Sequence, residues 1–467
     1  MVVFFISCNS GNRDQNANTD SSVVTHAPTY DKSLINGKVT DSVICRSLNG
    51  GSYALYLPSY YSSDKKFPCI YFFDAHARGA MPVHMYKGLA EKYGFVLVGS
   101  NVSKNGTPWQ VTNDAVKMLL EDTRTRINID TKRIYTAGFS GGSRVACTVA
   151  IMDGGVAGVI GCAAGFPSVE PVFQNKFDYF GMAVDYDFNL TEMEQWDETL
   201  EQNGFAHQLL ISGGIHGWAV SSDFQTALLW IQVNAMKENL QSKNDTLILA
   251  LKNDYEKRIA AAKSLRDWIK VHELSDGMVR VLDGFTDVST YRKRSADLVA
   301  CNDYKNAIAI QVQLQQTELN QQRELAKQFT VQDEKWWTRK IAELHQKANS
   351  AKTQESQMYR RLLNYLGLVG YMNCDHALKA GDLTNAFTYL KVFKIADPQI
   401  PDCSFLTAVY YMKKGNPQQA ISSLNEAVSS GYSEVSTLIT DPSFNSLKDD
   451  AVFKNIVIKV QANNTPK

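Results

Sequence analysis

The stretch RIYTAGFSGGSRVA, residues 133–146, decides the fold of this chain. Its first half, up to Phe139, is rich in residues that favour strands, whereas its second half is rich in small residues and predicts a helix. Between them lies Gly138-Phe139-Ser140-Gly141-Gly142, a GxSxG motif whose glycines permit a strained strand-to-helix turn that presents a serine hydroxyl above a sheet. The motif alone is weak, and an ordinary Gly-rich turn is the competing interpretation; the strand before it and the helix after it favour the functional one.

Short β-rich runs alternate with helical stretches on both sides of this motif, from about residue 30 to residue 240. The predicted strands are Tyr53–Leu57, Cys69–Phe73, Phe95–Ser100, Arg133–Phe139, Val156–Ala163, Phe177–Val184 and His207–Ser212. The predicted helices are Val83–Tyr93, Thr112–Ile127, Thr191–Gln202, whose Thr191 and Glu194 match a capping box, and Ser222–Leu240. This alternation predicts a doubly wound α/β domain with a mostly parallel sheet over residues 30–240.

After Leu240 the β signal disappears, and residues 241–370 predict a helical connector rich in Gln, Lys and Glu. Within residues 371–467 a repeat follows at an offset of 34 residues. It pairs Gly381 with Gly415, Asp382 with Asn416, Ala386 with Ala420 and Leu390 with Leu424. The pattern resembles tetratricopeptide repeats, which stack as helix pairs. Two coincidentally similar helix pairs are the alternative, because only two copies match where about three are needed for a stable array.

Composition limits the classes of protein to consider. Hydrophobic residues make up 44% and charged residues 21%, which is ordinary for a globular chain. The 48 Lys and Arg residues equal the 48 Asp and Glu residues, so no net charge attracts a polyanion, and we do not expect nucleic acid as a partner. The eight cysteines include no CxxC pair, and no P-loop or HExxH motif occurs, so neither a metal nor a cofactor is predicted.

The N-terminus, residues 1–29, predicts a lipid anchor. Five apolar residues, Val2 to Ile6, precede Ser7 and Cys8, and a polar stretch without periodicity follows. The apolar run is too short to span a bilayer, but a small residue followed by Cys resembles a bacterial lipoprotein cleavage box. We therefore expect lipidation at Cys8 and a place in the cell envelope, periplasmic or exterior, which fractionation of the native cells tests. The alternative is an ordinary cysteine in a frayed N-terminus.

A serine hydroxyl is a poor nucleophile at neutral pH, so it needs a base within hydrogen-bond reach, and in this kind of site the chain order is Ser, acid, His. The segment HQLLISGGIHGW, residues 207–218, puts His216 in a Gly-rich loop directly after a late strand, where that base is expected. The segment DYFGMAVDYDFNLTEM, residues 178–193, supplies two candidate acids, Asp185 and Asp187. Spacing alone does not decide between them. Glu192 and Glu194 are expected to be solvated or capping residues.

The negative oxygen that forms during acyl transfer needs two fixed N–H donors. One is expected from Gly141, the residue after the serine, and the other from the loop in IYFFDAHARGAMP, residues 70–82, at Ala75 or His76. In the same loop, Asp74 is expected to hold the backbone rather than to act as a base.

Five segments together resemble a known family. They are FFDAHARGAMPV (72–83), YGFVLVGSNVSKNG (93–106), RIYTAGFSGGSRVA (133–146), DFN (187–189) and GGIHGW (213–218). They are similar to secreted esterases related to polyhydroxybutyrate depolymerases and feruloyl esterases, which have the α/β-hydrolase fold, over about residues 66–218. The resemblance implies Ser140 as nucleophile, His216 as base, and Asp187, which precedes Phe-Asn, as acid. Ile215, between Gly214 and His216, departs from the family pattern.

The sequence therefore predicts a serine carboxylic-ester hydrolase that works through an acyl-enzyme intermediate, without cofactor or metal. An ester is the expected substrate, a protein is the expected partner of the helical repeats, and membrane contact is expected only through the lipid anchor. We also expect a chain ending near Ser242 to remain active. The alternatives are a non-enzymatic scaffold built on a relic hydrolase fold, and a peptidase or other acyl hydrolase.

Overall fold

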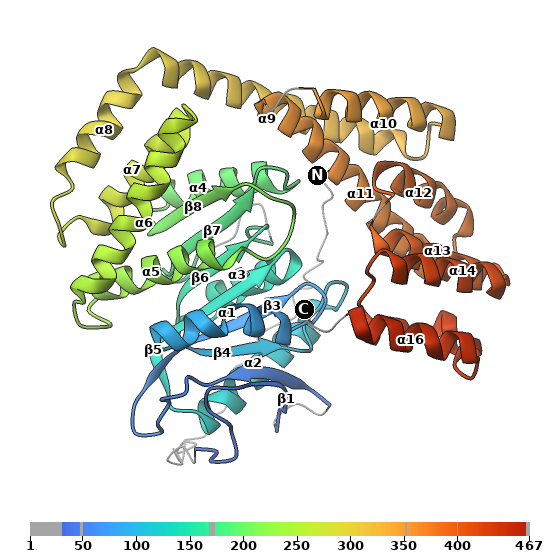
Figure 1. The fold of residues 1–467 in the computed structure, drawn as a ribbon, viewed down its shortest axis with the longest axis horizontal. Helices are drawn as coiled ribbons and strands as arrows, with labels where there is room; N and C mark the ends of the chain where they lie inside the picture. Colours follow the sequence, from blue (N-terminus) through green and yellow to red (C-terminus); the bar gives the residue numbers. More distant parts are fainter. Residues whose placement is uncertain (1–29, 47–49, 168–172, 351–352, 399, 464–467) are drawn as a thin grey trace, which may run out of the picture.

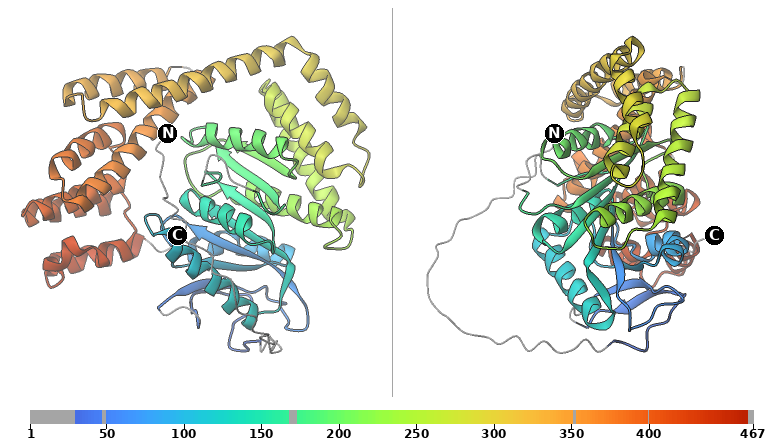
Figure 2. Two further views of the ribbon diagram at one scale, coloured as in Figure 1. Left: turned by 180° about the vertical axis from the view of Figure 1, so that it is seen from behind. Right: turned by 90° about the vertical axis from the view of Figure 1, so that its left-hand side faces the viewer.

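The computed structural model describes residues 30–46, 50–167, 173–350, 353–398 and 400–463. Cys8, the predicted lipidation site, lies outside these residues. The described part of the chain consists of an α/β part and a long helical part, which arches over one end of the sheet and then lies beside it (Figure 1; Figure 2). No helix among the described residues is long and apolar enough to cross a membrane.

The described residues form an eight-stranded sheet in the order β1-β2-β4-β3-β5-β6-β7-β8. Strand β2 pairs antiparallel with β1 and β4, and the pairings from β4 to β8 are parallel. The strands are β1 (Val39–Ile44), β2 (Ser52–Tyr56), β3 (Phe67–Asp74), β4 (Val96–Ser100), β5 (Ile129–Phe139), β6 (Val156–Cys162), β7 (Asp178–Val184) and β8 (His207–Ser212). The seven predicted strands are confirmed. The eighth, β1, was not predicted, because five of its six residues are only partly buried or exposed, in a pattern without alternation.

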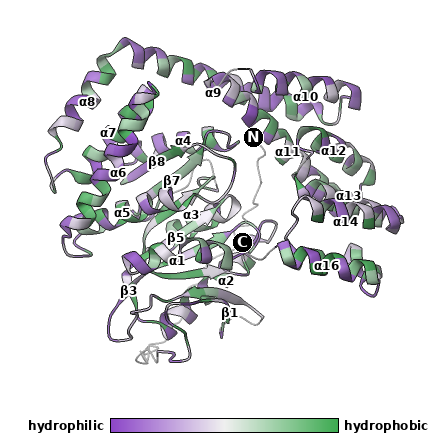
Figure 3. Ribbon diagram, in the orientation of Figure 1, coloured by the Kyte–Doolittle hydropathy of each residue, from purple (hydrophilic) through white to green (hydrophobic). Residues whose placement is uncertain are grey.

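Helices cover both faces of the sheet because the strands are apolar on both sides. In β3, Ile70 and Phe72 belong to one hydrophobic cluster, and Tyr71 and Phe73 belong to the other. The first cluster is covered by α1 (Ala80–Tyr93) and α5 (Ser221–Lys237). The second is covered by α2 (Trp109–Arg126), α3 (Gly141–Met152) and α4 (Leu190–Gln202). The predicted doubly wound α/β class is therefore confirmed. Hydrophobic and hydrophilic stretches alternate along the helices that cover the sheet (Figure 3).

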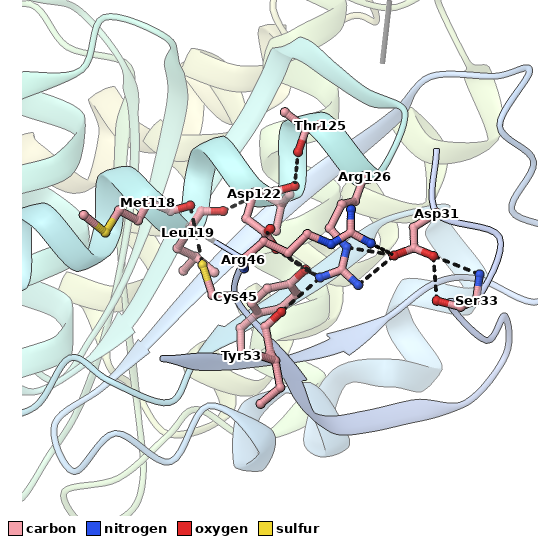
Figure 4. A network of polar contacts seen from close by, with 12 residues as sticks. Asp31, Ser33, Cys45, Arg46, Tyr53, Met118, Leu119, Asp122, Thr125 and Arg126 are labelled. Atoms are coloured by element: carbon pink, nitrogen blue, oxygen red, sulfur yellow. Dashed lines mark hydrogen bonds and ion pairs between the residues drawn. The ribbon is translucent and has the colours of Figure 1, made fainter. Parts of the chain in front are cut away.

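A buried polar network ties α2 to the first two strands (Figure 4). Arg126 donates to Asp31 Oδ2 at 2.9 Å and to Asp122 Oδ2 at 3.1 Å, and the Tyr53 hydroxyl donates to the same Asp122 oxygen at 2.9 Å. Arg46 adds a second guanidinium on Asp31, at 2.5 Å. Each buried charge in the network has a partner of opposite charge, so burying it is tolerated. The network stabilises the antiparallel edge of the sheet, and two strands separate β2 from β5, which precedes Ser140.

The hydrophobic core of the α/β part continues beyond residue 240. Helices α6 (Asp245–Ser264), α7 (Trp268–Leu282) and α8 (Ser289–Ala300) contribute to the same cluster as α1, α5 and one face of the sheet. Leu251 of α6 and Met278 of α7 are completely buried in it. The domain boundary predicted at residue 240 therefore cuts through a core and is wrong. It was misplaced because a change from strands to helices in the sequence does not mark where packing ends.

A chain truncated after Ser242 is expected not to fold, contrary to the prediction from sequence. Helix α5 is buried on almost every side, from Phe224 to Met236, and the loss of α6 and α7 would expose its outer face. Thermal unfolding followed by circular dichroism measures the effect. A chain ending after Ala300, which retains α6 to α8, is the control and is expected to melt cooperatively. A cooperative transition in the shorter chain would restore the boundary at residue 240.

The remaining helices lead to, and form, a separate packed unit. Helix α9 (Asn302–Gln328) is about 40 Å long at 1.5 Å per residue. The helical array that follows is defined here as residues 334–463. It comprises α10 (Glu334–Ala348), α11 (Gln354–Ala380), α12 (Leu383–Ala396), α13 (Pro401–Lys413), α14 (Pro417–Ser429), α15 (Val435–Thr440), a 3₁₀ helix (Pro442–Leu447) and α16 (Ala451–Asn463). The all-helical C-terminal region is therefore confirmed.

The residues of the predicted repeat occupy equivalent places in two helix pairs, α11–α12 and α13–α14. Gly381 and Gly415 have φ values of 77° and 76° in the turns. Each is followed by an N-cap residue whose side chain accepts a backbone N–H: Asp382 from Asn385, and Asn416 from Gln419. Ala386 and Ala420, which the repeat also pairs, are both fully buried. The helices are thus paired as the repeat predicts, whereas membership of the tetratricopeptide class stays a prediction.

The predicted capping box at the start of α4 is wrong. The helix begins at Leu190 with Asn189 as N-cap, two residues before the expected N-cap Thr191, and no side chain caps it. Glu194 instead accepts from Gln311 at 2.8 Å and from Gln315 at 2.7 Å, both on α9. Tertiary contacts with a helix more than 100 residues away therefore decide what Glu194 does, and local spacing does not reveal them.

Candidate active site

Ser140 occupies the turn between β5 and α3, as predicted. Its φ of 54° and ψ of −121° are values that L-residues rarely adopt, which costs about 1–3 kcal/mol. The turn is held by the Ser140 N–H, which donates to Cys162 O at 2.9 Å, and by the Ser143 N–H, which donates to Ser140 O at 3.0 Å. The strand before the turn and the helix after it therefore fix a strained serine at the carboxyl edge of the sheet.

Two glycines of the motif are required by close backbone contacts. A Cβ on Gly142 would lie 2.0 Å from the carbonyl oxygen of Phe73 in β3, so α3 can approach the sheet only with glycine there. A Cβ on Gly141 would lie 1.7 Å from Oδ1 of Asn105. The Asn105 side chain, from the loop after β4, therefore fills the space that a Cβ at position 141 would take.

His216 and Asp187 form a hydrogen-bonded pair beside this turn. His216 Nδ1 lies 2.9 Å from Asp187 Oδ2, and the other carboxylate oxygen of Asp187 accepts the Asn189 N–H at 2.8 Å. The Asp187 side chain is 0% exposed, whereas that of His216 is 22% exposed. With Nδ1–H donating to the carboxylate, Nε2 is the ring nitrogen that is left to accept a proton.

Two aromatic rings flank the imidazole. The ring centroid of His216 lies 4.8 Å from that of Phe139 and 4.5 Å from that of Phe188. Phe139 directly precedes Ser140, so this contact places His216 next to the turn that carries Ser140. Among the described residues the Ser140 hydroxyl makes no hydrogen bond to His216, and bonds of this kind often tighten only when substrate binds.

Among the described residues, the second candidate acid, Asp185, is hydrogen-bonded to groups other than His216. Its carboxylate Oδ2 accepts from Gln357 Nε2 of α11 at 3.3 Å, and its backbone N–H donates to Ser212 O at 3.0 Å. Burial raises the pKa of the Asp185 carboxyl, against the opposing effect of Lys270. The structure therefore brings Asp187, and not Asp185, together with His216.

The loop after β3 supplies the two remaining predicted residues. The His76 N–H donates to Asp74 Oδ1 at 2.8 Å, so this amide is engaged and the His76 alternative is not supported. Ala75 is buried, and its carbonyl accepts the Asn105 N–H at 2.8 Å. Ala75 and Gly141 therefore remain as the pair of candidate oxyanion donors.

Asp74 has the structural role that was expected for it. Its buried carboxylate accepts from Arg78 Nε at 2.9 Å and Nη2 at 3.2 Å, and from Trp218 Nε1 at 2.8 Å. Burial by itself would raise the pKa of this carboxyl, but the bond and charge of Arg78, with the N–H donors of His76 and Trp218, lower it below its usual value. A single ionised carboxylate thus joins the loop after β3 to the loop that carries His216.

Two residues of the site were missed or misjudged from the sequence. Asn105 lies in the segment Lys104-Asn105-Gly106, which predicts only a loop, and no pattern in the neighbouring sequence predicts its contact with Gly141. Glu192, expected to be solvated or capping, forms a two-pronged ion pair with Arg144 at 2.7 and 2.8 Å and accepts the Gly165 N–H at 3.2 Å. This pair joins the first turn of α3 to α4 and so stabilises the helix that follows the serine.

The order of the sheet and the strained serine after its central strand β5 define the α/β-hydrolase fold. No model of a protein family matches this chain, and no curated protein sequence matches it.

Solved structures of similar fold include two hydrolases and an esterase. The S-formylglutathione hydrolase FrmB from Staphylococcus aureus is 13% identical, with a TM-score of 0.36 over 42% of this chain and 99% of that one. The fluorophosphonate-binding serine hydrolase FphF from the same organism is 14% identical, with a TM-score of 0.33 over 39% and 92%. A CE1 ferulic acid esterase from Anaeromyces mucronatus is 16% identical, with a TM-score of 0.29 over 36% and 79%. At these values none of the likenesses carries an activity over to this chain.

Proposed function

We propose that this protein is a serine carboxylic-ester hydrolase, with Ser140 as nucleophile, His216 as general base and Asp187 as the acid that orients the imidazole. The observation that supports it most is the buried Asp187 carboxylate on Nδ1 of His216, next to a serine held in a strained turn. Burying a carboxylate is costly unless it is hydrogen-bonded, and the bond from Nδ1–H to Asp187 leaves Nε2 as the basic nitrogen of the ring.

The proposed reaction has two halves. In the first, Ser140 Oγ attacks the ester carbonyl carbon while its proton passes to His216 Nε2, and the Ala75 and Gly141 amides stabilise the negative oxygen. His216 then returns the proton to the departing alcohol, which leaves an acyl group on Ser140. In the second half water attacks the acyl-enzyme, His216 takes its proton, and the carboxylic acid is released with Ser140 restored.

Labelling with a fluorophosphonate probe tests this proposal against a non-enzymatic scaffold. The probe should modify Ser140, as mass spectrometry of the labelled peptide would show. A panel of acetyl, feruloyl and longer-chain esters, with the matching amides, then separates an esterase from a peptidase. Absence of labelling together with absence of ester turnover would contradict the proposal.

We further propose an envelope location through lipidated Cys8 and a protein partner for the helical array. The apolar-Ser-Cys sequence supports the first, and the matched helix pairs around Gly381 and Gly415 support the second.

A further inference from the structure

Helix α11 of the helical array contacts the loop that carries Asp187. Three side chains at positions i, i+4 and i+7 of this helix, and thus on one face of it, reach residues 185–189. Arg361 Nη1 donates to Asp185 O at 2.9 Å, Asn364 Nδ2 donates to Tyr186 O at 2.6 Å, and Gln357 Nε2 donates to Asp185 Oδ2 at 3.3 Å. The two backbone carbonyls just before Asp187 are therefore both held by the array.

The Arg361 side chain is itself fixed in place. Its guanidinium forms a buried ion pair with Glu318 of α9, with Nε at 2.9 and 3.0 Å and Nη2 at 2.7 Å from the carboxylate oxygens. The planar guanidinium can then direct its remaining nitrogen, Nη1, only toward the 185–189 loop. The Arg360 guanidinium adds a contact, 5.2 Å above the ring of Tyr186.

A second part of the array contacts the loop that carries Ala75. Glu434, between α14 and α15, accepts from Arg78 Nη1 at 3.2 Å and lies 3.7 Å from His76 Nδ1. Arg78 in turn holds both oxygens of Asp74. The array thus presents a carboxylate to two basic side chains of the loop after β3, and its charge is complementary to that loop.

These two contacts lie on opposite sides of the nucleophile. In the sheet, β3 and β7 stand on either side of β5 and β6, three strand spacings or about 14 Å apart. Ser140 follows β5, between them. A surface that served only to recruit another protein would have no reason to hold the loops on both sides of this serine.

We propose, on the basis of the esterase function proposed above, that the helical array is part of the catalytic unit and holds the acid and oxyanion loops in their working positions. Asn364 and Arg361 are positioning residues that act through Asp187, and Glu434 is a positioning residue that acts through Arg78 and the Ala75 loop. The array is therefore needed for turnover even when no protein partner is bound to it.

Asn364→Asp in the full chain tests the contact with the acid loop, because aspartate keeps the volume but has no N–H to donate to Tyr186 O. We expect kcat to fall by about 10- to 100-fold, since displacements of about 1 Å have such effects, while KM stays within about twofold. The pH profile of kcat/KM should change as well, because the imidazole that acts as base is held by Asp187.

The matched control is Asn425→Asp on α14, where the Asn425 amide donates to a backbone carbonyl within the array at 3.0 Å. This variant should behave as wild type in kcat and in pH profile, and both variants should melt within a few degrees of wild type. Glu434→Gln should lower kcat by about threefold to tenfold, because the ion pair that it weakens is partly exposed.

Hydrogen exchange provides a readout that does not depend on turnover. The Asp187 N–H donates to Val184 O and the Asn189 N–H donates to Asp187 Oδ1, so both amides should exchange faster in Asn364→Asp and unchanged in Asn425→Asp. If the wild type neither hydrolyses esters nor reacts with the fluorophosphonate probe, the proposed function is contradicted. The exchange rates of the Asp187 and Asn189 amides would still show whether the array holds the 185–189 loop. An active wild type, with Asn364→Asp equal to it in kcat and in exchange, would overturn the inference.

Discussion

Replacement of Ser140 by alanine is expected to lower kcat for ester hydrolysis by about 10⁴-fold or more, because nucleophile and base act as a unit. The fold should survive. Alanine has the same Cβ as serine, so the strain at φ 54° is unchanged, and no hydrogen bond of the hydroxyl is lost among the described residues. Kinetics with an activated ester, together with a melting curve, measure both effects.

The same variant distinguishes the proposed mechanism from its alternatives. His216→Ala should be as inactive as Ser140→Ala, and the double variant no worse than either, because each single change already disables the unit. Thr226→Ala on α5, whose hydroxyl contacts Asp254 at 2.8 Å, is a control away from the site and should stay active. Hydrolysis that survives Ser140→Ala would remove the mechanism altogether.

Much of the fold could be predicted because its signals are local. The strands that are buried on both faces, such as β3, give long apolar runs, and the GxSxG turn identifies the central one. Strand β1 lies at an edge of the sheet, where few of its side chains are buried, so its sequence has no clear hydrophobic pattern. The extent of the core was mispredicted for a different reason, since the packing of α6 and α7 on α5 depends on contacts that no local pattern records.

The residues of the candidate site also fall into those that local sequence patterns predict and those that they do not. Ser140 and His216 lie in glycine-rich loops that follow strands, which sequence reasoning can recognise. Asp185 and Asp187 are only two residues apart, so spacing left them undecided, and the difference arises from what faces each one: an imidazole for Asp187 and Gln357 of the array for Asp185. The contacts of Glu434 and Asn105 with the site come from distant or irregular segments and could not be predicted from the sequence.

The two aspartates give the sharpest test of the site. Asp187→Asn is expected to lower kcat by about 10⁴-fold, because an amide in place of the carboxylate neither stabilises the imidazolium nor keeps the proton on Nδ1. Its volume is the same, and the Asn189 N–H can still donate to the remaining oxygen, so the loop should keep its conformation. Activity against pH with an activated ester measures the loss.

Asp185→Asn is expected to cost at most a few-fold, although the residue lies in the same loop. The strong contact at this position is the bond from Arg361 to the backbone carbonyl, which the substitution leaves in place, and the side chain loses only a 3.3 Å bond from Gln357. Burial already raises the pKa of this carboxyl, so a neutral amide is well tolerated there. If Asp185→Asn were inactive and Asp187→Asn equal to wild type, the hydrogen bond on His216 Nδ1 would not be the catalytic one, and the positioning role given to Asn364 would lose its target.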